Sequence, residues 1–526
     1  MNYLVKIKKI NFWSLLSFLG LIILFSAINW NSLNMPFERD EGEYSYSAYI
    51  LDRGILPYEY SNSQKPPMII YTYWLAQKIN PDAVWPPRLL AIMFTMLTII
   101  LLGVISKKEF GYRAGHIAMW ISIPLLSFPY ITALSANTEK FMLLPLVGIL
   151  AIYTFNKSNA NSTPFFFAGI CAALTLLYKP IALYILVFLF IIWLRESWKI
   201  SHSLMSTIKN MGMAILAILL TSFFVLLYFL LTDGGASFWN SVIVYNQHYI
   251  SHLYNSVPES FLYYLNMFIH KLWILFPFLL FYFINKPKQW WLYLSLFIIA
   301  ILTVMPVPTG IGHYYLILMP FWILITTSAI QSLTHIINQK KIDEWQRALT
   351  LLITSIVIIA ILIPIQQQFF LTPNQLSIWI YGTGGNPFIE SKIVASKIKD
   401  LTTKDDYIFV AGSEPQIYFY SNRLSSSRFV TTYGLNIDTP LRAEHQRRAI
   451  DDLNVKPPEI IIVAPHPFSG LWESGSPRLF INYLNNLLKN NYYLIGGFVW
   501  NEIGGQWKDF SNNEFNNASL LLYKKL

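Results

Sequence analysis

The segment PFERDEGEYSYSAYILDRGILPYEYSNSQKPP, residues 36–67, brings many charged side chains together in an otherwise apolar chain. Its first eight residues carry Glu38, Arg39, Asp40, Glu41 and Glu43, and Lys65 lies near its end. An apolar run of about bilayer length precedes it, and further long apolar runs fill most of the chain that follows. Carboxylates beside a bilayer gain nothing from the lipid, so their concentration here requires another reason. We therefore predict that this segment is the catalytic loop of a membrane enzyme.

The composition places the whole chain in the membrane class. Of its 526 residues, 54% are hydrophobic and 13% are charged, whereas a soluble protein of this size carries about 25% charged residues. The net charge of +10 is explained by lysines and arginines in alternate loops, where they set membrane topology. We therefore predict no nucleic-acid partner. The only cysteine, Cys171, excludes an intrachain disulfide.

About eleven apolar runs approach the length needed to span a bilayer. They lie at approximately 12–30, 88–106, 116–132, 141–156, 164–178, 181–194, 211–231, 266–284, 290–305, 314–331 and 348–365. Alternate short loops contain the basic residues Lys107, Lys108, Arg113, Lys157, Arg195, Lys199, Lys286, Lys288, Lys340, Lys341 and Arg347. Short basic loops face the cytoplasm. We therefore predict a multi-pass protein of the cell (inner or plasma) membrane with a cytoplasmic N-terminus and an extracytoplasmic C-terminal region.

The composition changes after about residue 366, where elements typical of soluble proteins begin. Short apolar runs at 407–412 and 459–465 predict buried strands. The segments 441–453 and 478–490 have the apolar spacing of amphipathic helices. Strands that alternate with helices predict a small α/β domain.

The predicted fold is therefore a mostly α, polytopic membrane protein with a C-terminal soluble α/β domain. Residues 1–365 form the transmembrane domain, which includes the catalytic loop 31–87, and residues 366–526 form the extracytoplasmic α/β domain. The glycine-rich YGTGGNP, residues 381–387, lacks the Lys and Ser/Thr of a phosphate-binding loop. We predict that it is a linker turn.

Asp40 and Glu41 are the candidate catalytic residues of the loop. Acidic residues shortly after Pro36 are also typical of a helix start, because they favour the helix dipole. The other interpretation is a general base at the membrane surface. Desolvation there raises the pKa of a carboxylate and makes it a better proton acceptor near neutral pH. Both interpretations can hold for the same residues.

Further residues at predicted span ends are candidates for binding a substrate. Lys65 precedes two prolines, which restrict the chain and give its ammonium a defined position for a phosphate. Lys179 interrupts an apolar stretch, and charge at membrane depth marks a functional site unless the side chain only snorkels to the headgroups. Glu139 and His313, which Tyr314 follows, also lie at outer span ends, where helix capping or a structural role is the alternative.

His248 and His252 are the candidate metal ligands. Their i, i+4 spacing can bind a metal if the segment is helical, with Glu259 further along the chain. The segment is rich in tyrosine and asparagine, so a non-helical loop is the alternative. No cofactor is predicted with certainty, and a divalent metal is left open.

Five motifs occur in the order RDEGEYSYSAYILDRGILPY (39–58), QKPP (64–67), NTEKFMLLP (137–145), LYKP (177–180) and HYYLILMP (313–320). In these motifs and their order, roughly residues 10–365 resemble the GT-C glycosyltransferases. Within that group they look most like the bacterial branch related to protein O-mannosyltransferases and to the aminoarabinose transferase of lipid A (glycosyltransferase family 39/83-like).

The resemblance implies a glycosyltransferase whose donor is a sugar on a polyprenyl phosphate. The acceptor would be a hydroxyl of a cell-envelope glycan, a lipid or a protein, at the non-cytoplasmic face and among membrane lipids. Asp40 would be the base that activates this hydroxyl, and the sugar carbon would be inverted. The residues implied around the donor phosphate and sugar are Glu41, Lys65, Glu139, Lys179 and His313, with Tyr314 beside them.

One departure from the family pattern concerns the metal. Aminoarabinose transferases carry a glutamate metal ligand before the lysine of the KP motif, and Gln64 stands at that position here. The change weakens the case for a metal and for the same substrate.

A polytopic transporter or flippase of envelope lipids or solutes is the main alternative function. Transporters place ionisable sites near the middle of the bilayer, whereas the candidates here stand at span ends. A membrane-anchored assembly or sensor protein, with the soluble domain as its active part, is a third class.

Overall fold

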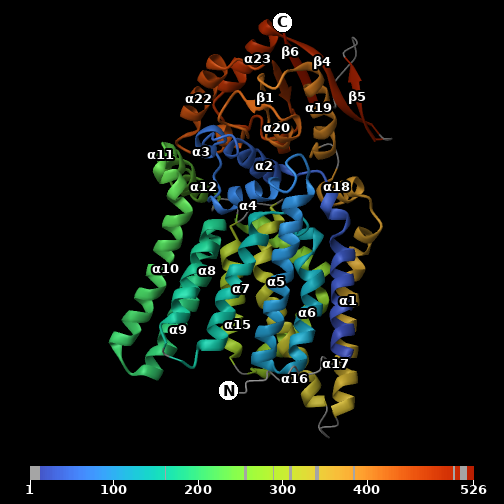
Figure 1. The fold of residues 1–526 in the computed structure, drawn as a ribbon. Helices are drawn as coiled ribbons and strands as arrows, with labels where there is room; N and C mark the ends of the chain where they lie inside the picture. Colours follow the sequence, from blue (N-terminus) through green and yellow to red (C-terminus); the bar gives the residue numbers. More distant parts are fainter. Residues whose placement is uncertain are drawn as a thin grey trace, which may run out of the picture.

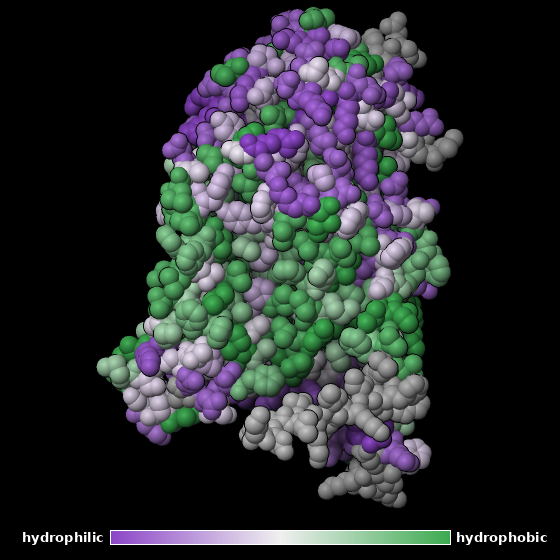
Figure 2. Space-filling model, in the orientation of Figure 1, coloured by the Kyte–Doolittle hydropathy of each residue, from purple (hydrophilic) through white to green (hydrophobic). Residues whose placement is uncertain are grey.

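The computed structural model describes residues 12–159, 161–253, 257–287, 289–306, 311–337, 343–382, 385–501, 504–509 and 518–526. A bundle of long helices carries an α/β layer at one end, and the segment between α1 and α5 lies between the two (Figure 1). Figure 2 shows a broad apolar band across the visible face of the bundle and a mostly polar surface over the α/β layer. This division is the one expected of a membrane protein with a domain in water.

The helices of the bundle cover every apolar run that the sequence predicts as a span. They are α1 (Phe12–Asn29), α5 (Trp85–Phe110), α6 (Tyr112–Leu126), α7 (Thr138–Asn156), α8 (Thr163–Tyr178), α9 (Leu183–Ser201), α10 (Leu204–Leu231), α13 (Val257–Lys271), α14 (Phe276–Asn285), α15 (Trp290–Val304), α16 (Met319–Ile337) and α17 (Asp343–Leu362). Among the described residues, seven helices are long and apolar enough to cross a membrane, and α8 and α15 are shorter apolar helices. The predicted fold class is confirmed.

One predicted span is not a single helix. The run at 266–284 falls on α13 and α14, whose axes differ by 83° across a break at Leu272. Pro277, near the start of α14, has no N–H to donate, and its ring excludes a helical carbonyl one turn earlier. The chain therefore forms a short 3₁₀ turn, Trp273–Leu275, in place of a continuous helix.

Burial separates the central helices of the bundle from the peripheral ones. The span that contains α16 is 83% buried, whereas only 17% of the apolar window of α10 is buried. Exposed large apolar side chains cover α10, including Leu219, Phe223 and Phe224. A helix with such a surface is stable in lipid and would not be stable in water. We therefore assign the surface of α10 to the bilayer.

The segment between α1 and α5 contains α2 (Arg39–Leu51), α3 (Pro57–Tyr60) and α4 (Met68–Gln77). Helix α2 begins with a capping box. The Glu38 carboxylate accepts from the backbone N–H groups of Asp40 (3.0 Å) and Glu41 (3.1 Å), and the Glu41 carboxylate accepts from the N–H of Glu38 (3.3 Å). The expected helix start at Asp40 and Glu41 is therefore present.

The α/β layer contains a six-stranded sheet of order β2-β1-β3-β6-β4-β5. Its strands are β1 (Tyr407–Ala411), β2 (Leu424–Ser425), β3 (Ile460–Val463), β4 (Tyr492–Asn501), β5 (Gly504–Asp509) and β6 (Ala518–Lys525). Strand β1 pairs in parallel with β2 and β3, and the remaining pairs are antiparallel. Its helices are α18 (Pro373–Tyr381), α19 (Phe388–Leu401), α20 (Gln416–Ser421), α21 (Tyr433–Asn436), α22 (Arg442–Val455) and α23 (Leu479–Asn491).

The glycine-rich segment 381–387 follows α18 and precedes α19. Gly382 has a φ of 79°, a conformation that favours glycine. Residues 383 and 384 of this predicted turn lie outside the described residues. The domain boundary at 365/366 stays a prediction.

Helix α2 packs on both layers at once. Tyr44 and Ala48 belong to the core of the helix bundle. Tyr46 and Ile50 belong to the core of the α/β layer, where they pack with β1 and β3. Because adjacent faces of one short helix enter two different cores, the α/β layer cannot move without α2.

Gly42 marks the closest approach of α2 to the α/β layer. A Cβ atom at this position would lie 2.5 Å from the backbone nitrogen of Gln416 in α20, closer than atoms can pack. We expect Gly42→Ala to lower the unfolding temperature of the detergent-solubilised protein, although alanine favours a helix by about 1 kcal/mol. Gly212→Ala is the matched control, since no atom lies within 4 Å of its added Cβ. Equal unfolding temperatures for the two variants would contradict the packing.

Candidate active site

The structure brings five of the predicted residues together at the end of the bundle next to the α/β layer. Asp40 comes from the first turn of α2, and Lys65 from the chain just before α4. Glu139 lies in the first turn of α7, Lys179 follows α8, and His313 lies in the 3₁₀ turn Gly312–Leu318 before α16. We call these five residues the charged cluster.

Asp40 is at the centre of the charged cluster. Its Oδ2 lies 3.6 Å from His313 Nε2 and 3.8 Å from Lys65 Nζ. Behind them Lys179 forms an ion pair and hydrogen bond with Glu139, whose Oε1 is also 3.9 Å from His313 Nε2. The distances to Asp40 exceed a hydrogen bond, so its carboxylate is attracted by its neighbours without being saturated by them.

Tyr314 contributes a ring to the same place. Lys179 Nζ lies 3.3 Å from the centroid of this ring, which is a cation–π contact. The ammonium of Lys179 is therefore fixed between the Glu139 carboxylate and an aromatic face, and it does not snorkel away from the cluster.

The pKa of Asp40 differs from the sequence-based expectation. Burial raises it, but the positive charge of Lys65, followed by His313 and Lys179, lowers the pKa of Asp40 below its ordinary value. For Lys65, burial lowers the pKa, but the Asp40 carboxylate together with Tyr314, Glu43 and Glu139 more than offsets this, so the pKa of Lys65 is raised. The net direction at Asp40 is therefore opposite to the raised pKa that we expected from desolvation, because the positive neighbours together outweigh burial. Both groups are ionised near neutral pH.

Glu41 is not brought to the charged cluster. Arg88 of α5 donates to both of its oxygens, from Nε at 2.9 Å and from a terminal nitrogen at 2.5 Å, and the N–H of Ala136 donates to Oε1 at 2.9 Å. Arg88 also donates to the backbone oxygens of Ser32 and Pro36. Glu41 and Arg88 are fully buried. Glu41 therefore anchors the loop to the bundle.

The metal prediction gains no support. His248 and His252 lie on the helix α12 (Tyr245–Leu253), so their spacing does place them on one face, but the side chain of His252 lies outside the described side chains. No group of three His, Cys, Asp or Glu side chains suited to a metal occurs within the described part of the chain. Gln64 offers a neutral amide oxygen, which lacks the charge that a carboxylate would supply to a divalent ion.

A narrow cleft of about 70 Å³ opens beside Asp40. It is lined by Arg39, Asp40, Glu43, Ser61, Asn62 and Gln64 of the loop, by Tyr245 of α12, and by Phe429, Thr431, Tyr433 and Gly434 of the α/β layer. The buried Oε1 of Gln64 and the hydroxyl of Tyr44, one turn beyond Asp40, have no hydrogen-bond partner in the described structure. Unpaired buried polar atoms are costly, so these atoms indicate a place for a polar ligand.

Glu43 is a residue of this cleft that the sequence analysis missed. It lies one turn after Asp40 and accepts a hydrogen bond from the Ser63 hydroxyl at 2.6 Å. Burial raises the pKa of Glu43 to about 7, although Lys65 lowers it. The sequence did contain a signal for Glu43: it follows Asp40 at i, i+3, and two residues at that spacing lie on one face of a helix.

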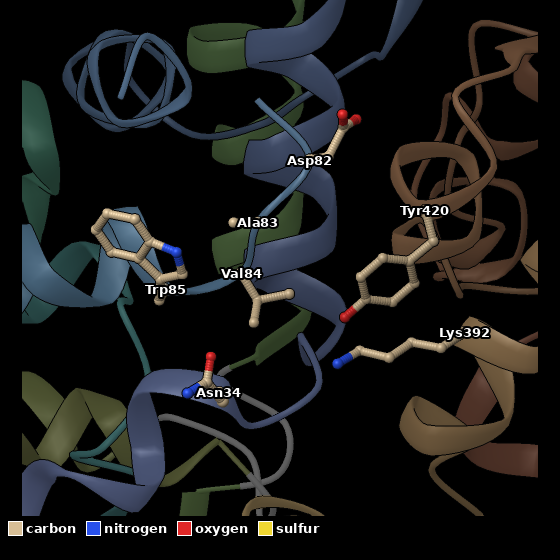
Figure 3. Close-up of a pocket in the computed structure, with 7 residues that line it drawn as sticks. All are labelled: Asn34, Asp82, Ala83, Val84, Trp85, Lys392 and Tyr420. Carbon is tan, nitrogen blue, oxygen red and sulfur yellow. The ribbon is translucent and has the colours of Figure 1, made fainter. Parts of the chain in front are cut away.

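A larger cavity of about 380 Å³ lies elsewhere, between the α/β layer and the ends of α1 and α5 (Figure 3). Its lining residues are Asn34, Asp82, Ala83, Val84, Trp85, Lys392 and Tyr420. No member of the charged cluster lines it. The narrow cleft, which contains Asp40, is therefore the candidate active site.

The sequence matches no protein-family model and no curated protein. The structure is similar to that of ArnT from Cupriavidus metallidurans bound to undecaprenyl phosphate, with a TM-score of 0.62 at 12% identity over 97% of each chain. The apo form of ArnT gives a TM-score of 0.59 at 13% identity. Both are GT-C proteins. The chain has the GT-C fold.

An oligosaccharyltransferase from Archaeoglobus fulgidus, tethered with an acceptor peptide, has the same fold. Its TM-score is 0.52 at 12% identity over 96% of this chain and 75% of that one. Identities this low establish the shared fold alone. The substrate and the chemistry must be argued from the charged cluster.

The Glu41–Arg88 pair generates a stability prediction. Removal of one partner of a buried ion pair leaves an unpaired charge and costs about 3–5 kcal/mol. We expect Arg88→Met to lower the unfolding temperature strongly. Lys78→Met is the matched control, because Lys78 and Asp52 form an exposed pair that contributes about 0–1 kcal/mol. Similar unfolding temperatures for both variants would show that Glu41 is not anchored through Arg88.

The raised pKa of Glu43 generates a pH prediction. A carboxyl whose pKa is raised by folding stabilises the protein below its unfolded value of about 4.3, and this contribution disappears as the pH rises through about 7. We expect the unfolding temperature of Glu43→Gln to increase relative to the wild type between pH 5 and pH 8. Asp52→Asn is the control, since the Lys78 hydrogen bond lowers the pKa of Asp52 and moves its titration below this range. Parallel curves for Glu43→Gln and the wild type would contradict the assignment.

Proposed function

We propose that the protein is a membrane glycosyltransferase that transfers a sugar from a polyprenyl-phosphate donor to an acceptor hydroxyl. The observation that carries the proposal is the position of the Asp40 carboxylate, which faces Lys65 and His313 at the lipid boundary with Lys179 and Glu139 behind them. The GT-C fold supports it, as does the similarity to a protein whose structure contains undecaprenyl phosphate. The proposed face is the non-cytoplasmic one, since the opposite loops carry the basic residues.

The charged cluster contains the groups that such a transfer needs. A polyprenyl phosphate is a good leaving group, so the reaction requires a base on one side of the sugar carbon and positive charge at the departing phosphate. Asp40 accepts the proton of the acceptor hydroxyl. Lys65 and Lys179 stabilise the phosphate through charge-assisted hydrogen bonds. Attack opposite the phosphate inverts the sugar carbon.

The low pKa of Asp40 affects how this base acts. An aspartate that is ionised throughout the neutral range is ready to accept a hydrogen bond from the hydroxyl in every molecule of the enzyme. It gains the proton as the negative charge moves onto the phosphate beside Lys65 and Lys179. The lysines therefore keep Asp40 charged in the free enzyme and bind the leaving group during the reaction.

The narrow cleft is the proposed entrance for the acceptor. Its aromatic residues Tyr245, Phe429 and Tyr433 and its amides Asn62 and Gln64 suit a polar molecule that combines hydroxyl groups with apolar faces. A glycan, a glycolipid headgroup or a protein hydroxyl fits this description.

A transporter or flippase is the less favoured function. The charged cluster lies where the helices end, against the α/β layer, and transporters place such residues near the middle of the bilayer. No observation on the described residues favours transport over transfer.

The proposal predicts that Asp40→Asn lowers sugar transfer about a hundredfold or more, since asparagine cannot accept the proton. The protein should remain folded and in the membrane. Transfer is measured by mass spectrometry of cell-envelope glycans from cells that lack the protein and express each variant.

Lys65→Ala should mainly weaken the binding of undecaprenyl phosphate, measured by native mass spectrometry of the purified protein. Lys78→Ala is the control for the loss of a lysine from the same loop. Normal transfer by Asp40→Asn would exclude Asp40 as the base. Uptake of a solute into vesicles, with unchanged envelope glycans, would favour the transporter.

A further inference from the structure

The α/β layer contacts α2 by hydrogen bonds before, beside and after Asp40. Before it, the N–H of Phe37 donates to the hydroxyl of Tyr420 in α20 at 2.7 Å. After it, the N–H of Ser425 in β2 donates to the hydroxyl of Tyr46 at 2.9 Å. Between these two contacts Arg39, the residue directly before Asp40, reaches into the α/β layer.

Arg39 is bonded through its whole guanidinium group. Nε donates to the Ser413 backbone oxygen and to Glu414 Oε1, both at 3.0 Å, and a terminal nitrogen donates to the same carboxylate oxygen at 2.6 Å. The other donations go to the Gly385 backbone oxygen at 3.0 Å, the Ser469 hydroxyl at 3.5 Å and the Asn386 side-chain oxygen. We call the Arg39–Glu414 pair the arginine clamp.

Glu414 is prepared for this contact within the α/β layer. Its side chain is fully buried, and it accepts from the Ser469 hydroxyl at 2.5 Å and from the Gln416 amide at 2.8 Å. These two contacts hold the carboxylate in place within the α/β layer, and a buried charge requires a partner of opposite charge. That partner is Arg39, the residue next to the candidate base Asp40.

Asp40 is therefore flanked by two residues that are fixed in different parts of the protein. Arg39 is bound to the α/β layer, and Glu41 is bound to Arg88 of the bundle. Within the described part of the chain, the carboxylate of Asp40 itself makes only the longer contacts to Lys65 and His313. The direction of the Asp40 side chain is thus set by the backbone of residues 39–41, and the arginine clamp holds one end of that backbone in place.

We propose that the α/β layer is part of the active site, with Arg39 and Glu414 as positioning residues that orient Asp40 for proton transfer. This inference rests on the proposed function. Arg39 touches the cleft, but its donors are taken by the α/β layer, so it acts on the reaction through Asp40. The Phe37 and Tyr46 contacts and the shared core around Tyr46 and Ile50 keep the layer docked when the clamp is broken.

The test uses the full chain with Arg39→Gln, Arg39→Lys and Glu414→Gln. Asp452→Asn is the matched control, because Asp452 pairs with Arg428 inside the α/β layer. Donor binding is measured with undecaprenyl phosphate by native mass spectrometry. Transfer is measured with the polyprenyl-phosphate sugars extracted from the membranes of the expression host, together with the acceptor fraction of those membranes.

We expect Arg39→Gln and Glu414→Gln to lower the apparent kcat about tenfold to a hundredfold, the effect of a small misplacement of a reacting group. The apparent KM for the donor and the affinity for undecaprenyl phosphate should stay within about threefold of the wild type. Arg39→Lys should recover part of the rate, and Asp452→Asn should behave as the wild type. In an Asp40→Asn background, Arg39→Gln should cause no further loss.

Two results would overturn the inference while leaving the proposed function intact. One is a kcat within about twofold of the wild type for Arg39→Gln, with Asp40→Asn inactive. The other is a parallel loss of lipid binding and kcat in Arg39→Gln, which would make Arg39 a residue of the fold only. Activity in Asp40→Asn would instead remove the proposed function itself.

Discussion

The structure depends on the placement of one short helix between two separate cores. One side of helix α2 packs in the core of the helix bundle and another in the core of the α/β layer. Each side also carries a largely buried charged residue that needs a partner of opposite charge. Glu41 pairs with Arg88 of the bundle, and Arg39 pairs with Glu414 of the α/β layer. A buried charge without a partner is so unfavourable that these pairs fix the helix in one position. Asp40 lies between Arg39 and Glu41 in the sequence, and its carboxylate faces the other members of the charged cluster.

The charged cluster obeys a second constraint, which is electrostatic. Two carboxylates, Asp40 and Glu139, and two lysines, Lys65 and Lys179, share one small volume at the end of the bundle next to the α/β layer. Their charges compensate one another, so the cluster can be buried without a net charge. Under the proposed function, a substrate that brings a phosphate and a hydroxyl would exchange its own groups for these contacts. The same lysines that lower the pKa of Asp40 would then be available to the departing phosphate.

The sequence was sufficient for what depends on local pattern and insufficient for what depends on long-range contacts. Apolar runs predicted the helices of the bundle, and the strands at Tyr407–Ala411 and Ile460–Val463 follow from their short apolar runs. The antiparallel strands β4, β5 and β6 were missed because they are set by pairing with one another and, for β6, with β3. The break at Leu272 had a local signal in Pro277, which the long apolar run around it obscured. Lys179 was predicted from its charge in an apolar stretch, Glu139 and His313 from their places at span ends, and Lys65 from the two prolines that follow it. The sequence could not separate the roles of Asp40 and Glu41. Adjacent residues of a helix point in different directions, and the direction of each depends on a distant partner, which for Glu41 is Arg88.

The measurement that tests the account most directly is an experimental structure of the protein with undecaprenyl phosphate in a lipid environment. The account predicts that the phosphate lies within hydrogen-bond distance of Lys65 and Lys179. Lys65 should then have turned away from Asp40, whose carboxylate should face the space that the sugar would fill. A phosphate bound at the larger cavity, beside Lys392 and Asn34, with Lys65 still next to Asp40, would contradict it.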